Sequence, residues 1–258
     1  MTTLLLYDKL IQKRNGTKHE NLIEFITEKA VDTRDMITYE YGNKEANTVF
    51  IQPVDDHDLS GIESEVKMIR ELAGADFRLI AVKVGDWNRD LSPWEAPAVF
   101  GKEDFGGGAS DTLSEILSLT EDREKTYYIG GYSLAGLFAL WAVYRTDVFS
   151  GAAAASPSVW FPGFTDLVKS NQIKCGKVYL SLGDKEEKAK NPVMATVGDC
   201  IREIYGVLKE QNIDCTLEWN QGNHFKDADL RTAKAFAWLI GKKYNETGIQ
   251  NQRNTAGR

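Results

Sequence analysis

The segment Tyr127–Gly136 reads Tyr-Tyr-Ile-Gly-Gly-Tyr-Ser-Leu-Ala-Gly and runs into an apolar stretch with helical spacing. This pattern predicts a strand, a sharp turn and a helix, with Ser133 on the turn. The chain on either side of such a serine passes so close that small residues are needed two positions before and after it. Gly131 and Ala135 meet this requirement, although the strict pattern has a second glycine at position 135. The start of the helix directs the Leu134 N–H toward a developing oxyanion, so the segment predicts a nucleophilic serine.

A glycine-rich turn that binds phosphate is the alternative interpretation of this segment. A phosphate loop has the pattern Gly-x-Gly-x-x-Gly or a lysine followed by serine or threonine. The run Gly131–Gly136 has neither the middle glycine nor the lysine. We therefore favour the nucleophile over the phosphate site.

His224 is the candidate base. The histidines of the chain are His19, His57 and His224, and only His224 follows a predicted strand late in the sequence. A hydrolase of the strand–turn–helix type places its residues in the order nucleophile, acid, base, which this position satisfies. His19 lies outside the predicted core and is given no role.

The acid must follow the strand before the one that precedes His224. The loop after the predicted strand Lys177–Leu182 supplies Asp184, Glu186 and Glu187. A buried carboxylate here would orient the imidazole and stabilise its protonated form. The residues alone do not choose among the three.

The elements that must position these side chains alternate between short apolar runs and helical patterns, which predicts parallel βαβ units. Several runs are apolar throughout, as expected when helices cover both faces of a sheet. The predicted strands are Ile37–Tyr41, Thr48–Gln52, Arg78–Val84, Thr126–Gly130, Gly151–Ala155, Lys177–Leu182 and Cys215–Trp219, and the predicted helices are Ile62–Leu72, Thr112–Ser118, Leu134–Arg145, Val193–Gln211 and Asp229–Lys243.

The chain has 258 residues, which fits one large α/β domain. We expect an N-terminal segment over residues 1–35, packed on or leading into the core, an α/β domain over 36–244 and a polar tail over 245–258. The connection Gly85–Ser110 is long for a loop inside a domain and carries Trp87 and Trp94. Such loops are usually functional, so we expect it to form a rim of the active site, with a mobile decoration as the alternative.

Composition narrows the class of protein. Hydrophobic residues make up 42% of the chain and charged residues 27%, as in ordinary globular proteins. The formal net charge of −7 argues against a nucleic-acid partner. Cys175, Cys200 and Cys215 form no metal-like pattern, and the N-terminus lacks the features of a secretory leader. We therefore expect reduced thiols, a cytoplasmic location and no membrane segment.

With these residues placed, the chain resembles the α/β-hydrolase superfamily over residues 36–244. Within it, the resemblance is to the esterase group that includes esterase D, feruloyl esterases and enterochelin-esterase-like proteins. Besides the Ser133 segment, it rests on Arg89–Trp94, Phe105–Ala109, Ala155–Trp160 and Gly222–Phe225. The fold that it implies is a mostly parallel central sheet with helices on both faces and no large lid domain.

The resemblance also implies roles. That group often places its acid three residues after a glycine, which here favours Glu186, after Gly183, over Asp184 and then Glu187. The oxyanion segment of the group is replaced by Gln52–Asp58, whose backbone N–H groups at Val54 and Asp55 are the candidates beside that of Leu134. We expect His57 in that segment to be a polar loop residue, with substrate contact as the alternative.

The resulting hypothesis is a serine hydrolase that cleaves a small-molecule carboxylic ester through an acyl-enzyme. Ser133 would attack, His224 would act as base, and Glu186 would hold the imidazole, with no metal or organic cofactor. Trp160, Trp87 and Trp94 would wall the pocket. The alternatives are an acyltransferase or thioesterase with the same nucleophile, or a catalytically silent binding protein. The oligomeric state stays open.

Overall fold

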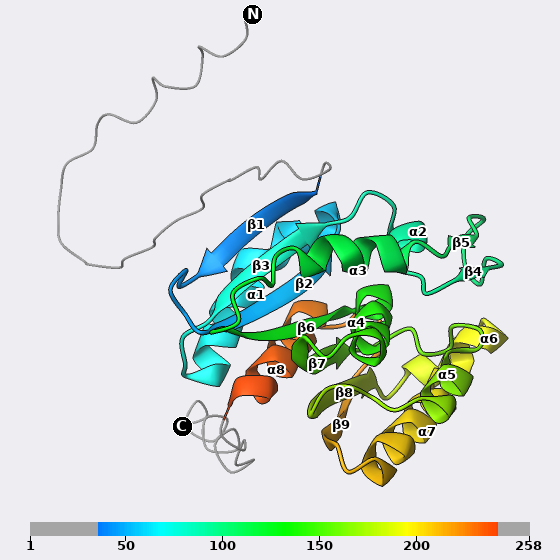
Figure 1. Cartoon of the computed structure of the whole chain (residues 1–258). Helices are drawn as coiled ribbons and strands as arrows, with labels where there is room; N and C mark the ends of the chain where they lie inside the picture. Colours follow the sequence, from blue (N-terminus) through cyan, green and yellow to red (C-terminus); the bar gives the residue numbers. More distant parts are fainter. Residues whose placement is uncertain (1–35, 242–258) are drawn as a thin grey trace, which may run out of the picture.

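A seven-stranded sheet forms the centre of the computed structural model, which describes residues 36–241 (Figure 1). The strand order is β1-β3-β2-β6-β7-β8-β9. Only β1, at one edge, runs antiparallel to its neighbour β3, and the other neighbouring pairs are parallel. The strands are β1 (Ile37–Gly42), β2 (Thr48–Val54), β3 (Arg78–Lys83), β6 (Thr126–Tyr132), β7 (Phe149–Ala155), β8 (Lys177–Gly183) and β9 (Asp214–Asn220). The mostly parallel sheet predicted from the sequence is confirmed.

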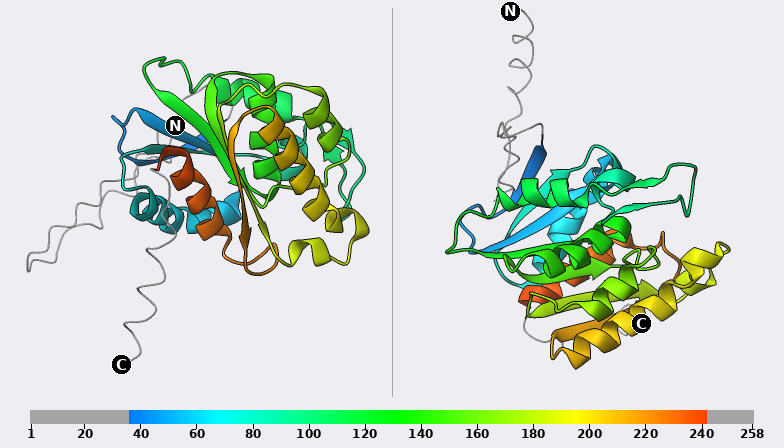
Figure 2. Two further views of the ribbon diagram at one scale, coloured as in Figure 1. Left: turned by 90° about the horizontal axis from the view of Figure 1, so that it is seen from below. Right: turned by 45° about the vertical axis from the view of Figure 1, so that its right-hand side comes forward.

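Helices cover both faces of this sheet, as expected (Figure 2). The side chains of α3, α4, α5 and α7 pack into the core on one face, and those of α1 and α8 pack on the other. The helices are α1 (Asp56–Ala73), α2 (Trp87–Asp90), α3 (Ala109–Leu117), α4 (Ser133–Arg145), α5 (Phe164–Ser170), α6 (Pro192–Ala195), α7 (Val197–Glu210) and α8 (Ala228–Ile240), with a 3₁₀ turn η1 at Glu186–Lys188.

Strand β7 shows how the sequence permits this packing. Its residues alternate between the two faces, so Ala152 and Ala154 join the core under α4 while Ala153 and Ala155 join the core under α8. Alanine at all four positions lets both helices approach the strand closely. Helix α4 is correspondingly apolar on nearly every side, with residues 134–144 all buried.

The structure differs from the sequence prediction in the connections. The predicted helix Val193–Gln211 is two helices, α6 and α7, separated at Thr196, whose N–H bonds to the Val193 carbonyl at 3.1 Å. The long connection Gly85–Ser110 is not structureless: it contains α2 and a two-stranded ribbon of β4 (Glu95–Ala96) and β5 (Phe105–Gly106). Helix α5 and turn η1 were not predicted.

Two predicted segments, 1–35 and 245–258, lie outside the described residues, as does the end of the predicted helix Asp229–Lys243. Within residues 36–241, no helix combines the length and the apolar character needed to cross a membrane.

Candidate active site

Ser133 lies on the turn between β6 and α4, where the sequence predicted it. Its backbone φ is +57°, a left-handed conformation that is uncommon for residues other than glycine. Gly131 explains how the turn closes, because a Cβ atom there would lie 2.6 Å from the Cβ of Ala135. The turn therefore holds Ser133 in a strained conformation at the carboxyl end of the strand, as in a nucleophile elbow.

Within residues 36–241, the Ser133 hydroxyl has two polar side chains close to it. Its Oγ lies 3.0 Å from Nε2 of His224 and 3.2 Å from Oγ of Ser158. The Ser158 N–H also donates to the carbonyl of Ser133 at 3.0 Å. Leu134, the next residue, is in the first turn of α4, where backbone N–H groups have no acceptor within the helix.

Glu186 is the acid that contacts His224. Its Oε2 lies 2.7 Å from Nδ1 of His224, and a carboxylate can only accept, so the imidazole N–H donates. The Glu186 residue is 7% exposed. The other two acids of the loop face elsewhere: Asp184 accepts from the Gly222 N–H at 2.8 Å, and Glu187 pairs with Arg202 at 2.7 Å.

The surroundings of Glu186 favour its ionised form. Burial by itself raises the pKa of this carboxyl, but the hydrogen bond and charge of His224 oppose burial, together with hydrogen bonds from the Gly183 N–H and the Ser156 hydroxyl. The net result is a pKa below the usual value for glutamate. An ionised carboxylate beside Nδ1 fixes the imidazole with Nε2 directed at Ser133.

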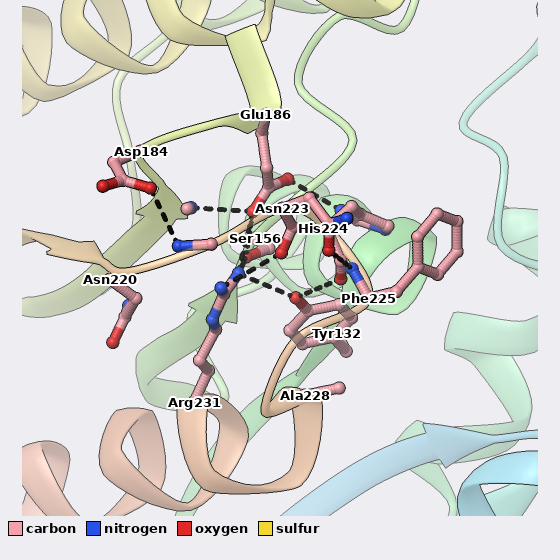
Figure 3. A network of polar contacts seen from close by, with 12 residues as sticks. Tyr132, Ser156, Asp184, Glu186, Asn220, Asn223, His224, Phe225, Ala228 and Arg231 are labelled. Atoms are coloured by element: carbon pink, nitrogen blue, oxygen red, sulfur yellow. Dashed lines mark hydrogen bonds and ion pairs between the residues drawn. The ribbon is translucent and has the colours of Figure 1, made fainter. Parts of the chain in front are cut away.

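Three further residues of this network were missed by the sequence analysis: Tyr132, Ser156 and Arg231 (Figure 3). Figure 3 shows the Arg231 side chain extending from α8 into the centre of the network. Its Nη1 lies 2.9 Å from Oε1 of Glu186, which also accepts from the Ser156 hydroxyl at 2.8 Å. One signal could have indicated Arg231: it stands four residues before Ala235, on the buried side of a predicted helix.

The predicted oxyanion segment has a different local structure from the expected loop. Val54 is the buried last residue of β2, and Asp55 caps α1, which begins at once at Asp56. The Asp55 N–H faces Oδ2 of Asp58 at the long distance of 3.4 Å. His57 is an exposed residue of the first turn of α1, so the prediction of a loop residue was wrong. The capping pair Asp55 and Asp58 gives the physical reason, because it starts a helix there.

Two of the three predicted pocket tryptophans join one aromatic cluster. Trp160 is buried against Phe105 at 6.2 Å between ring centroids, and Phe105 contacts Phe161 at 5.1 Å. Trp94 packs edge-on against Phe161 at 5.5 Å and donates its indole N–H to the Pro162 carbonyl at 3.0 Å.

Trp87 lies elsewhere, as the partly buried first residue of α2. Two exposed aromatic side chains lie beside this aromatic cluster and beside His224. Phe100 packs edge-on against Trp160 at 6.0 Å and is 42% exposed, while Phe225, directly after His224, is 87% exposed. The long connection therefore contacts the segment that follows β7, next to Ser158.

The structure resembles solved structures of esterases and serine hydrolases. An IroE-like serine hydrolase from Shewanella oneidensis superposes with a TM-score of 0.67 at 15% identity, over 84% of this chain and 80% of that one. The siderophore hydrolase EstA from Aspergillus nidulans gives 0.62 at 17% identity, over 88% and 99%. A Bacillus cereus carboxylesterase gives 0.52 at 16% identity, over 80% and 95%.

These likenesses and the sheet topology define the class of fold: the chain has the α/β-hydrolase fold. No protein-family model matches the sequence, and no curated protein matches it. The fold expected from the sequence resemblance is confirmed.

Proposed function

We propose that this protein is a serine hydrolase that cleaves carboxylic esters through an acyl-enzyme. The observation that carries the proposal is the chain of two hydrogen bonds that joins three side chains. The Ser133 hydroxyl lies 3.0 Å from Nε2 of His224, whose Nδ1 lies 2.7 Å from the buried carboxylate of Glu186. Esterases and serine hydrolases among the structures of similar fold support the same reaction class.

In the proposed mechanism, His224 accepts the hydroxyl proton while the Ser133 oxygen attacks the acyl carbon. Glu186 stabilises the protonated imidazole. The tetrahedral intermediate collapses when His224 returns the proton to the leaving alcohol, which departs and leaves the acyl group on Ser133. A water molecule, deprotonated by His224, then attacks the acyl-enzyme, and His224 returns that proton to the Ser133 oxygen as the carboxylic acid is released.

The proposed donors to the oxyanion are the Leu134 N–H and a second N–H from Val54 or Asp55. The Leu134 N–H needs no rearrangement, since it lies in the first turn of α4 beside the nucleophile. Among the described residues, the Asp55 N–H has the Asp58 carboxylate as its side-chain acceptor, and a hydrogen bond of 3.4 Å is weak enough for a substrate oxygen to replace it.

The proposed substrate is a small-molecule ester with an apolar group. Trp94 and Trp160 would support one wall of its site through the aromatic cluster, and Trp87 would contribute from α2. We further propose that residues 36–244 form the catalytic domain. A cytoplasmic location is also proposed, in keeping with the three free cysteines.

A panel of p-nitrophenyl esters with increasing acyl length tests the reaction class. We expect turnover by the parent protein, and a loss of about 10⁴-fold or more in kcat/KM for Ser133→Ala. Ser118→Ala is the matched control, because Ser118 is an exposed residue whose hydroxyl bonds only to the Glu115 carbonyl among the described residues. Hydrolysis by Ser133→Ala at the parental rate would refute the proposal. Adding alcohol acceptors and measuring new esters separates a hydrolase from an acyltransferase.

A further inference from the structure

Arg231 is a buried cation in the middle of the site. The residue is 1% exposed and extends from the first turns of α8. Its Nη1 donates to Oε1 of Glu186 at 2.9 Å, to the Ser156 hydroxyl at 3.1 Å and to the Tyr132 hydroxyl at 3.1 Å. A buried guanidinium requires such partners, because an unpaired charge in the interior is strongly destabilising.

The other terminal nitrogen of Arg231 contacts the loop that carries the base. Its Nη2 donates to the carbonyls of Asn223 at 3.1 Å and Gln221 at 3.4 Å, just before His224 in the chain. The Tyr132 hydroxyl, which accepts from Nη1, donates in turn to the His224 carbonyl at 2.7 Å. One guanidinium therefore joins the acid and the backbone of the base loop (Figure 3).

The two oxygens of Glu186 have different tasks. Oε1 accepts from the Gly183 N–H at 2.7 Å, the Ser156 hydroxyl at 2.8 Å and Arg231 at 2.9 Å. Oε2 has the His224 imidazole at 2.7 Å. Three donors on one oxygen fix the rotation of the carboxylate, so the other oxygen stays directed at Nδ1.

The site has no room for a side chain at position 183. A Cβ atom at Gly183 would lie 2.4 Å from the Gly222 carbonyl and 3.0 Å from both Oε1 of Glu186 and Nη1 of Arg231. The acid loop, the base loop and the guanidinium therefore meet in direct contact at this glycine.

We propose that Arg231 is a positioning residue of the Ser133–His224–Glu186 relay. It holds Glu186 as a carboxylate with one oxygen directed at His224, and it fixes the loop that carries His224 at the same point. This inference rests on the proposed hydrolase function. The alternative is that Arg231 only stabilises the fold, as a buried ion pair with no effect on the relay.

A charge effect separates the two possibilities. The charged and titratable groups that meet here are Glu186 from η1, His224 from the β9–α8 loop, Tyr132 from β6 and Arg231 from α8, while Asp184 turns to the Gly222 N–H. Removing the one permanent cation makes the Glu186–His224 pair easier to protonate. The acid limb of kcat/KM must then move to higher pH, which a purely structural role does not require.

The experiment compares pH profiles of kcat and KM for the parent, Arg231→Gln and Arg231→Lys, each normalised to active sites titrated with a fluorophosphonate. For Arg231→Gln we expect the midpoint of the acid limb of kcat/KM to move up by about 1 pH unit. We also expect kcat per site to be at least about tenfold lower, with a small change in KM. For Arg231→Lys we expect the parental acid limb but a lower kcat per site, since one ammonium cannot reproduce the planar fork of donors.

Lys234→Gln is the matched control. Lys234 lies one turn further along α8 and pairs with Glu218 at 2.5 Å, away from the relay, so the same charge change should leave the acid limb unmoved. A parental profile and kcat per titrated site in Arg231→Gln would overturn the inference. If Arg231→Gln does not fold, a parental kcat per site in Arg231→Lys overturns it instead. Either result leaves the proposed hydrolase function intact. That proposal fails if activity does not depend on Ser133.

Discussion

Asp184 and Glu186 are separated by a single residue in the chain, yet they hold different parts of the loop that carries His224. Glu186 contacts the imidazole itself at 2.7 Å, whereas Asp184 accepts from the backbone N–H of Gly222 at 2.8 Å. The side chain of one acid thus contacts the imidazole, and that of the other contacts the backbone of the loop.

This difference predicts unequal effects of two matched variants. We expect Glu186→Gln to lower kcat/KM by about 10³- to 10⁴-fold, because a neutral amide neither stabilises the protonated imidazole nor keeps its tautomer. Asp184→Asn should cost less than about tenfold, since it weakens a single hydrogen bond to the loop. Steady-state kinetics on a short p-nitrophenyl ester measures both.

Glu187→Gln is the control, because Glu187 pairs with Arg202 outside the relay. Circular dichroism at the assay temperature must show that Glu186→Gln is folded, since the substitution leaves Arg231 without its anion. If Asp184→Asn were less active than folded Glu186→Gln, the assignment of Glu186 as the acid would be wrong.

The turn at Ser133 predicts that Gly131→Ala is destabilising. The added methyl group would lie 2.6 Å from the Cβ of Ala135, so the first turn of α4, which also contains Ser133, must shift. We expect a loss of about 1 to 3 kcal/mol in the free energy of unfolding, with a parallel loss of activity. Denaturant titration measures the first quantity.

Two further variants isolate the cause. Ala135→Gly in the Gly131→Ala background removes the nearest clashing atom and should restore part of the stability. Gly206→Ala, in the open surroundings of α7, should instead stabilise the protein by about 0.5 to 1 kcal/mol. Equal losses at positions 131 and 206 would show that close approach at the turn is not the cause.

A buried carboxyl on α1 makes stability depend on pH. Glu65 is 5% exposed, and its pKa is raised well above the usual value, first by burial and then by the negative charges of Asp229 and Asp58. The folded protein therefore keeps a proton that the unfolded chain has released. Above the ordinary range of a glutamate, the free energy of unfolding should fall with rising pH, by at most about 1.4 kcal/mol per unit from this group.

The variant Glu65→Gln should remove the part of the pH dependence of stability that comes from Glu65. We expect it to unfold at higher denaturant concentration than the parent at pH 8, with the difference shrinking toward pH 4.5. The control is Glu63→Gln, an exposed neighbour on the same helix. Parallel curves of stability against pH for the parent and Glu65→Gln would contradict the prediction.

The elements around Ser133 and His224 were predictable because their signals are local. Alternation and apolar runs located the strands of the main sheet, and small residues at 131 and 135 marked the turn. The start of α1 is also encoded locally, in the capping pair Asp55 and Asp58, but the sequence prediction began this helix only at Ile62. The prediction of His57 as a loop residue failed for this reason.

The acid and its partner were not predictable from local pattern alone. Three acids share one loop, and the turn η1 decides which of them faces His224. The contacts of Arg231 depend on how α8 packs against the loops after β7, β8 and β9, which lie far from α8 in the sequence or follow other strands. Only the family resemblance favoured Glu186 beforehand.

Covalent labelling of the nucleophile tests the central claim most directly. The protein is treated with a fluorophosphonate, digested, and the modified peptide is sequenced by mass spectrometry. We predict one label per chain on Ser133, at a rate that falls sharply in His224→Ala. A label on Ser158, whose hydroxyl is only 3.2 Å from that of Ser133, or no label on an active preparation, would contradict the assignment of Ser133 as the nucleophile.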